Sequence, residues 1–139
     1  MSVLEILSLG NRIVGEVVER HGFRWHALSS GNSSGGEFAA GEFRRNDRAL
    51  EFSFRRSLGC VQYRMGELAL RHTELMRQVV PPGRSSCYPG FSNDPLDGFR
   101  HLALDLSAYC QIFLSGTDAE FRLLCNRARA RGLERPRLP

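Results

Sequence analysis

The spacing of apolar residues changes twice along this chain, and the change restricts the folds open to it. From residue 3 to residue 21 apolar side chains recur every three or four positions, as on one face of a helix. From residue 23 to residue 65 they alternate with polar ones, which is typical of half-buried strands. The helical spacing then returns. The sequence therefore predicts a helix, then a sheet, then further helices.

Residues 3–21 are expected to form the first helix. Ser2 and Glu5 have the spacing of a capping box, in which the two side chains satisfy free backbone amides at a helix start. Gly22 is placed to end the helix, because glycine readily adopts the left-handed conformation found after helix ends. Gly10 is a weak point within the helix, since glycine has a low helix propensity.

Four segments in the middle of the chain have the alternating pattern of strands: residues 23–28, 38–43, 50–55 and 61–65. The glycine- and serine-rich residues 31–36 are expected to form a flexible hairpin loop. Short connections between successive strands indicate an antiparallel meander. Residues 66–71 fit either a short return strand or a direct lead into a helix. The predicted sheet therefore has three to five strands.

In the second half of the chain, the sequence pattern predicts three helices and one long loop. Residues 75–80 form a short helix that ends at a Pro-Pro-Gly sequence, and the loop occupies residues 81–93. Asp94 is expected to cap a helix that reaches residue 115. A second capping-box sequence opens the last helix, over residues 117–132.

These elements predict one α+β domain over residues 1–132, with a loose tail at 133–139. The N-terminal helix and the C-terminal helices are expected to pack on one face of the sheet. The chain of 139 residues is close to the commonest domain size. No apolar run approaches the ~20 residues that span a bilayer, and residues 1–9 lack the basic start of a secretory signal. We therefore expect a cytoplasmic protein that does not bind membranes.

Cysteine and histidine are too scattered to predict a metal site. Zinc needs three or four closely organised ligands, and the four cysteines and four histidines show no paired spacing. We expect neither a metal nor another cofactor. Cys110 and Cys125 fall on the apolar faces of predicted helices, so they are expected to be buried as small hydrophobic residues.

No catalytic residue is predicted, although two candidates exist. His101 and Asp105 lie four residues apart on one predicted helix face, where they could pair as base and orienting group. The favoured interpretation is an ordinary surface pair. Cys87 lies in the long loop without a local nucleophile signature and is interpreted as a spectator thiol. A small enzyme with a cleft under residues 81–94 is kept as the least favoured alternative.

The most distinctive stretch combines loop aromatics with acidic residues at a predicted helix start. Its predicted partner-binding residues are Tyr88, Phe91, Asn93, Asp94, Asp97 and Arg100. Aromatic residues are enriched at protein interfaces, which favours a rigid recognition loop. In the alternative interpretation, the aromatics close the edge of the core and the acids cap the helix.

The helix that follows this loop resembles part of small bacterial immunity-type proteins, which are encoded beside polymorphic or contact-dependent toxins. The resemblance lies in Phe99-Arg100-His101-Leu102, in Asp105-Leu106 and in Phe113-Leu114-Ser115-Gly116. It implies a cytoplasmic protein that binds one toxin domain and blocks its active site. Inhibitors of nucleases are often acidic, whereas this chain carries a net charge of +4. The implied partner is then not a nuclease, or it contacts a local acidic patch.

Nucleic acid is the alternative partner. All nineteen basic residues are arginine, and arginine makes planar, bidentate contacts with phosphates. Arg44, Arg45 and Arg48, together with the arginines of residues 117–139, could contact a nucleic-acid backbone. The basic excess lies mainly in residues 117–139, whereas dedicated nucleic-acid binders spread it over a face. The leading hypothesis is therefore a non-enzymatic protein-binding domain.

Overall fold

A helix, a five-stranded sheet and four further helices follow one another along the chain. The structure is a computed structural model that describes the backbone of residues 1–134 and the side chains of residues 1–132. Helix α1 (Val3–Val18) continues into a short 3-10 helix, η1 (Glu19–His21). The later helices are α2 (His72–Val79), α3 (Asp97–Tyr109), α4 (Gln111–Ser115) and α5 (Asp118–Glu134).

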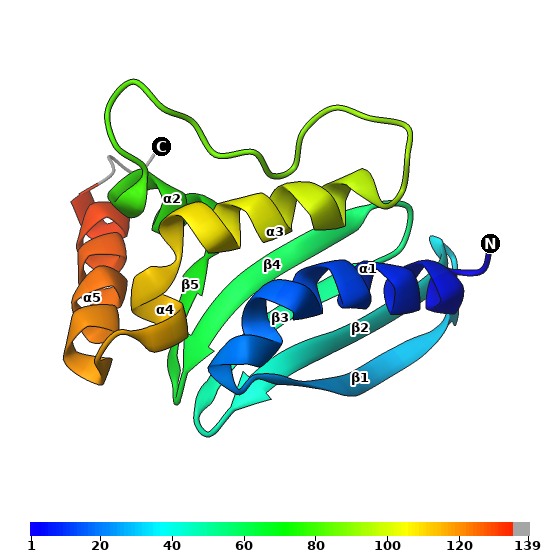
Figure 1. The fold of residues 1–139 in the computed structure, drawn as a ribbon, viewed down its shortest axis with the longest axis horizontal. Coiled ribbons are helices and arrows are strands. Elements are labelled where there is room, and N and C mark those ends of the chain that lie inside the picture. Colours follow the sequence, from blue (N-terminus) through cyan, green and yellow to red (C-terminus); the bar gives the residue numbers. More distant parts are fainter. Residues whose placement is uncertain (135–139) are drawn as a thin grey trace.

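The sheet is an antiparallel meander in which each strand pairs with the next one in the sequence. Its strands are β1 (Arg24–Ser33), β2 (Gly36–Arg45), β3 (Arg48–Phe54), β4 (Leu58–Met65) and β5 (Leu68–Arg71). Figure 1 shows the helices on one face of this sheet, with α1 and α3 side by side across the middle strands. The predicted α+β architecture is confirmed.

Aromatic side chains join the sheet to α3. Phe52 and Phe54 alternate with polar neighbours on β3, so both point to the helical face, and both contact the ring of Phe99 on α3. Phe99 is completely buried, and Phe43 on β2 extends the same cluster. Burying a side chain of this size contributes roughly 1.5–3 kcal/mol. The cluster fixes α3, and with it the end of the long loop that leads into α3.

Gly10 marks the place where α1 crosses α3. A Cβ atom at this position would lie 2.4 Å from the ring of Phe99, which no packed structure accommodates without movement. Glycine is therefore required here by close helix packing, although it weakens the helix itself.

In the first half of the chain, two segments differ from the sequence prediction or were left open by it. The predicted loop over residues 31–36 is wrong in extent, because β1 continues to Ser33 and β2 begins at Gly36. Backbone pairing across the hairpin therefore reaches its tip. For residues 66–71 the sequence allowed either a short return strand or a direct lead into a helix. The structure has the short strand β5 here, and α2 follows it directly.

The helices of the second half also differ in their ends. Asp94 is not the N-cap of α3, because its carboxylate accepts the Leu96 amide and so holds a turn before the helix begins at Asp97. The helix predicted to reach residue 115 is broken at Cys110 into α3 and α4. Helix α5 passes the expected end at residue 132 and reaches Glu134. Most of the expected loose tail, residues 135–139, lies outside the described residues.

Candidate functional site

The long loop between α2 and α3 is fastened to the body of the protein by one buried carboxylate. The loop passes along α3 in Figure 1. Asp105 projects from α3 and is 0% exposed. Its Oδ1 accepts the Cys87 amide at 2.7 Å, and its Oδ2 accepts the Tyr88 amide at 2.9 Å. These two bonds fix the middle of the loop against α3.

The same carboxylate begins a chain of buried side chains. Oδ2 of Asp105 lies 2.9 Å from Nε2 of His72, the first residue of α2. Nδ1 of His72 lies 2.8 Å from the Tyr63 hydroxyl on β4, which lies 3.6 Å from the Cys110 sulfur. Every contact is satisfied when His72 donates through Nε2 and accepts the Tyr63 proton at Nδ1. The chain thus connects the loop, α2, α3 and the sheet.

Burial and hydrogen bonding set the ionisation of these groups. Burial alone would raise the pKa of Asp105, but hydrogen bonds from His72 and from the Cys87 and Tyr88 amides outweigh it and lower that pKa. Burial raises the pKa of Tyr63 well above its ordinary value, and it raises the pKa of Cys110 to about 12. Asp105 is therefore an ionised acceptor, while Tyr63 and Cys110 stay protonated.

This arrangement resembles a catalytic relay in its residue types but not in its access to solvent. Both ring nitrogens of His72 already have protein partners, and the side chain is 4% exposed. A general base must reach the proton that it removes, directly or through one water. The Asp105–His72–Tyr63 chain therefore serves to hold the loop in place.

The two catalytic candidates from the sequence are not brought together. The predicted pairing of His101 with Asp105 is wrong, because Asp105 turns inward to His72 while Nδ1 of His101 donates to the Pro89 carbonyl at 3.0 Å. The Cys87 thiol is exposed, and desolvation together with the nearby Asp105 carboxylate raises its pKa. A raised pKa makes a thiol a poorer nucleophile at neutral pH.

Tyr88, the first of the predicted partner-binding residues, faces the protein. Its hydroxyl donates to the Leu58 carbonyl at 2.6 Å, and its ring makes a T-shaped contact with the His72 ring. Burial, with a smaller effect from Cys60, raises the pKa of Tyr88 to about 12. The Tyr88 side chain therefore attaches the loop to β4.

The remaining predicted residues gather at the tip of the loop and at the start of α3. Phe91 is fully exposed, and Asn93 beside it is exposed as well. Arg100 makes ion pairs with both Asp94 and Asp97. The backbone amide of Leu96 and the Arg100 side chain lower the pKa of Asp94, while Ser92 and Arg100 lower the pKa of Asp97. Arg100 thus partly neutralises the negative charge of Asp94 and Asp97.

Two hollows flank the second half of the loop, from Tyr88 onward. One, of about 200 Å³, lies between the loop tip and the turn from β3 to β4, and its walls include Arg56, Pro89 and Asp97. The other, of about 410 Å³, lies beside Cys60, Tyr88 and the buried edge of His72. The first hollow is also lined by Gly90 and Ser92, the two neighbours of Phe91.

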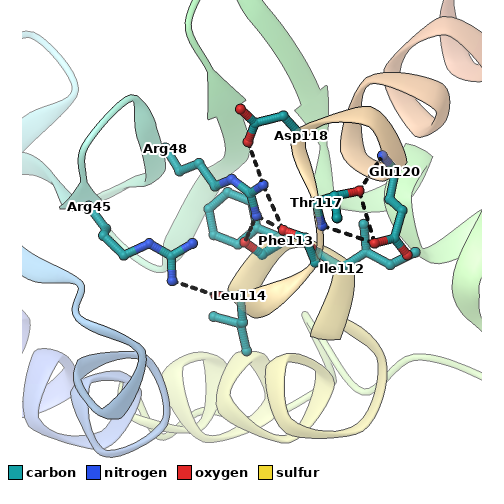
Figure 2. A network of polar contacts seen from close by, with 9 residues as sticks. Arg45, Arg48, Ile112, Phe113, Leu114, Thr117, Asp118 and Glu120 are labelled. Atoms are coloured by element: carbon teal, nitrogen blue, oxygen red, sulfur yellow. Dashed lines mark hydrogen bonds and ion pairs between the residues drawn. The ribbon is translucent and has the colours of Figure 1, made fainter.

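Two of the arginines assigned to nucleic-acid binding are used inside the protein. Figure 2 shows Arg48 reaching the C-terminal end of α4, where it donates to the carbonyls of Ile112 and Phe113. It donates to the carbonyl of Gly116, the C-cap of α4, as well. Arg48 also pairs with Asp118 at the start of α5. Figure 2 shows Arg45 donating to the Leu114 carbonyl, and it donates to the His21 carbonyl as well.

These contacts place positive charge where helix dipoles are negative. Arg48 is 4% exposed, so its guanidinium cannot reach a nucleic acid. Arg44 is half exposed and forms an ion pair with Glu42. The prediction that Arg45 and Arg48 contact phosphates is therefore wrong for Arg48, and Arg45 is already engaged with two backbone carbonyls.

Within the part of the chain that the structure describes, histidine, cysteine and acidic side chains form no group of three or more that could hold a metal ion. No helix in that part combines the length and apolar character needed to cross a membrane. In comparisons with protein families, curated proteins and solved structures, nothing matched this chain.

Proposed function

We propose that this chain is a non-enzymatic protein-binding domain whose contact surface is the tip of the 81–96 loop and the adjoining start of α3. The surface consists of Phe91, Asn93, Asp94, Asp97 and Arg100. The partner that we propose is a bacterial toxin domain, in line with the resemblance of residues 99–116 to immunity-type proteins.

The supporting observation is the full exposure of Phe91 on a loop that is fixed at its middle. Aromatic residues are enriched at protein interfaces, but single exposed apolar residues are common on any protein surface, so the fixed support of Phe91 is the deciding observation. Here the Asp105 bonds to Cys87 and Tyr88 hold the chain just before Phe91. A side chain presented on a fixed support loses little entropy on binding, which is the condition for an interface anchor.

The charges beside Phe91 suit a polar rim. Asp94, Asp97 and Arg100 carry both signs within one exposed cluster, so a partner with complementary charges can exchange ion pairs with them. Rim charges of this kind affect association rate and specificity more than affinity. We therefore assign the anchoring role to Phe91 and the selective role to the charged cluster.

The experiment compares two tagged variants with the wild type. Each protein is used to capture partners from a lysate of the source cells, and the affinity of the captured protein is then measured by calorimetry. Phe91→Ser should weaken binding roughly thirtyfold, as expected for an anchor worth about 2 kcal/mol. Leu28→Ser is the matched control, because Leu28 is also more than half exposed but lies on β1, far from the loop in sequence.

The toxin assignment has its own readout. The captured protein, expressed alone in a sensitive host, should stop growth, and co-expression of the wild-type chain should restore it. Rescue that Phe91→Ser loses and Leu28→Ser keeps would support both parts of the proposal. Equal binding by both variants would remove the loop tip from the proposal, and a harmless partner would remove the toxin.

A further inference from the structure

A basic hollow of about 260 Å³ lies between α2 and α5, where β5 leads into α2. The residues of the β5–α2 wall that carry the argument are Arg71, Thr73 and Arg77, and those of the α5 wall are Ala128, Arg131 and Gly132. None of them belongs to the proposed partner surface. The hollow therefore calls for an explanation of its own.

The charge of the hollow is strongly positive. Three guanidinium groups line it, and among the described residues none of them forms an ion pair with a carboxylate. Glu74 is the acid in the lining, and its carboxylate accepts the Arg71 amide at 2.9 Å. Among the described residues Arg44, Arg48, Arg64 and Arg100 have carboxylate partners, whereas other arginines, such as Arg24 and Arg84, have none. What distinguishes the hollow is that three arginines without a carboxylate partner among the described residues line one space.

A hydrogen bond between α2 and α5 fixes the distance between the two walls of the hollow. The Gln78 side chain on α2 donates to the Leu124 carbonyl on α5 at 2.8 Å, which ties the helices together beside the hollow. Ala128 and Gly132 lie one turn apart on α5, so the part of the α5 wall beside Arg131 has little side-chain bulk. A Cβ atom added to Gly132 would meet no described atom within 4 Å. The space is therefore open in the free protein, which lowers the cost of binding.

We propose that this hollow binds a small phosphate monoester, whose phosphoryl group is held by Arg71, Arg77 and Arg131. Guanidinium groups bind phosphate oxygens through paired hydrogen bonds. A phosphate monoester carries a charge of about −1.5 to −2 at neutral pH, which balances three arginines set against one glutamate. The Thr73 hydroxyl supplies a further hydrogen-bonding group at the wall.

A small molecule fits the hollow better than a nucleic acid. A nucleic-acid surface neutralises many phosphates along a basic face, whereas these three arginines line one hollow of about 260 Å³. That space admits a phosphoryl group with a small body. Arg45 and Arg48, which would extend a basic face, are turned into the protein instead.

The test is calorimetric titration with glucose 6-phosphate, inorganic phosphate, glucose and a single-stranded oligonucleotide. The full chain should bind glucose 6-phosphate at one site and should not bind glucose. Arg77→Ala and Arg131→Ala should each weaken binding by roughly tenfold or more, as expected for a lost charged hydrogen bond. Arg24→Ala, on the exposed strand β1, is the matched control and should bind like the wild type.

Gly132→Leu gives a second test that leaves the charge unchanged. A leucine here extends into the open space and should block the phosphate ester, while circular dichroism shows an intact fold. Binding that survives both Gly132→Leu and Arg77→Ala would overturn the site. A failure of glucose 6-phosphate to bind, binding of inorganic phosphate alone, or tighter binding of the oligonucleotide would overturn the ligand class.

Discussion

The carboxylate of Asp105 lies 2.9 Å from the imidazole of His72, and both side chains are withdrawn from solvent. His72 is the first residue of α2 and Asp105 lies within α3, so their hydrogen bond connects the two helices that flank the long loop. The same carboxylate accepts two amides from the loop itself. One buried ionised group therefore controls both the position of the loop and the packing of the helices that it joins.

Asp105→Asn should destabilise the protein by about 3 kcal/mol, within the range for breaking a buried charged network. The carboxylate accepts three hydrogen bonds from His72, Cys87 and Tyr88. An asparagine offers one acceptor oxygen and turns two N–H donors toward groups that are themselves donors. Urea denaturation should show the loss as a lower transition midpoint.

Hydrogen exchange locates the same effect in the structure. The Cys87 and Tyr88 amides should exchange much faster in Asp105→Asn than in the wild type, because their acceptor is altered. Asp94→Asn is the matched control, since Asp94 is exposed and caps only a turn, and it should leave both amides protected. Unchanged protection in Asp105→Asn would show that the loop is held by other contacts.

Acid should weaken the contribution of Asp105 in a defined pH range. Its pKa in the folded protein lies below the ordinary value of 3.8, so its stabilisation is complete above that value. It is lost as the pH falls through the folded-state pKa, where the folded protein also takes up the proton. The stability difference between wild type and Asp105→Asn should therefore be constant from neutral pH to near 3.8 and shrink below it. A difference that already shrinks near neutral pH would contradict the lowered pKa.

Arg48→Met should destabilise the protein by about 3 kcal/mol without changing its secondary structure. The substitution keeps most of the side-chain volume but removes the donor to three carbonyls at the end of α4 and to Asp118. Buried acceptors left without a donor carry a desolvation cost of about 1–3 kcal/mol each. Thermal and urea unfolding measure the loss, and Arg24→Met on exposed β1 should change little. An unaffected Arg48→Met protein would mean that water replaces the guanidinium.

The sheet could be predicted because its signal is local. Leu50, Phe52 and Phe54 alternate with polar residues, and the structure places all three in the core. Helix ends depend on contacts from distant residues, which no local pattern contains. The break at Cys110 separates α3 from α4, whose terminal carbonyls bind Arg45 and Arg48, residues that precede them by more than sixty positions. The same limit applies to Asp94, whose capping sequence forms a turn instead.

The exposed residues of the candidate site could be named from the sequence, but the buried residues that hold the loop in place could not. The exposed Phe91 and the charged cluster that follows it stand together in one short segment. The supporting contacts join Asp105 to His72, 33 positions away, and His72 to Tyr63. Helical spacing instead suggested His101 as the partner of Asp105, because spacing records which residues share a helix face and not which face is buried.

Two glycines on helices should respond to alanine in opposite directions. Gly10→Ala should destabilise the protein, since its Cβ would lie 2.4 Å from the Phe99 ring and force α1 away from α3. The cost should be about 1–3 kcal/mol, as for other overpacked sites. Gly132→Ala should instead raise stability by about 0.5 kcal/mol, because its Cβ meets no described atom within 4 Å and alanine favours the helix. Thermal unfolding of both variants measures these changes in stability. A stabilised Gly10→Ala protein would mean that α1 and α3 do not pack as closely as the structure shows.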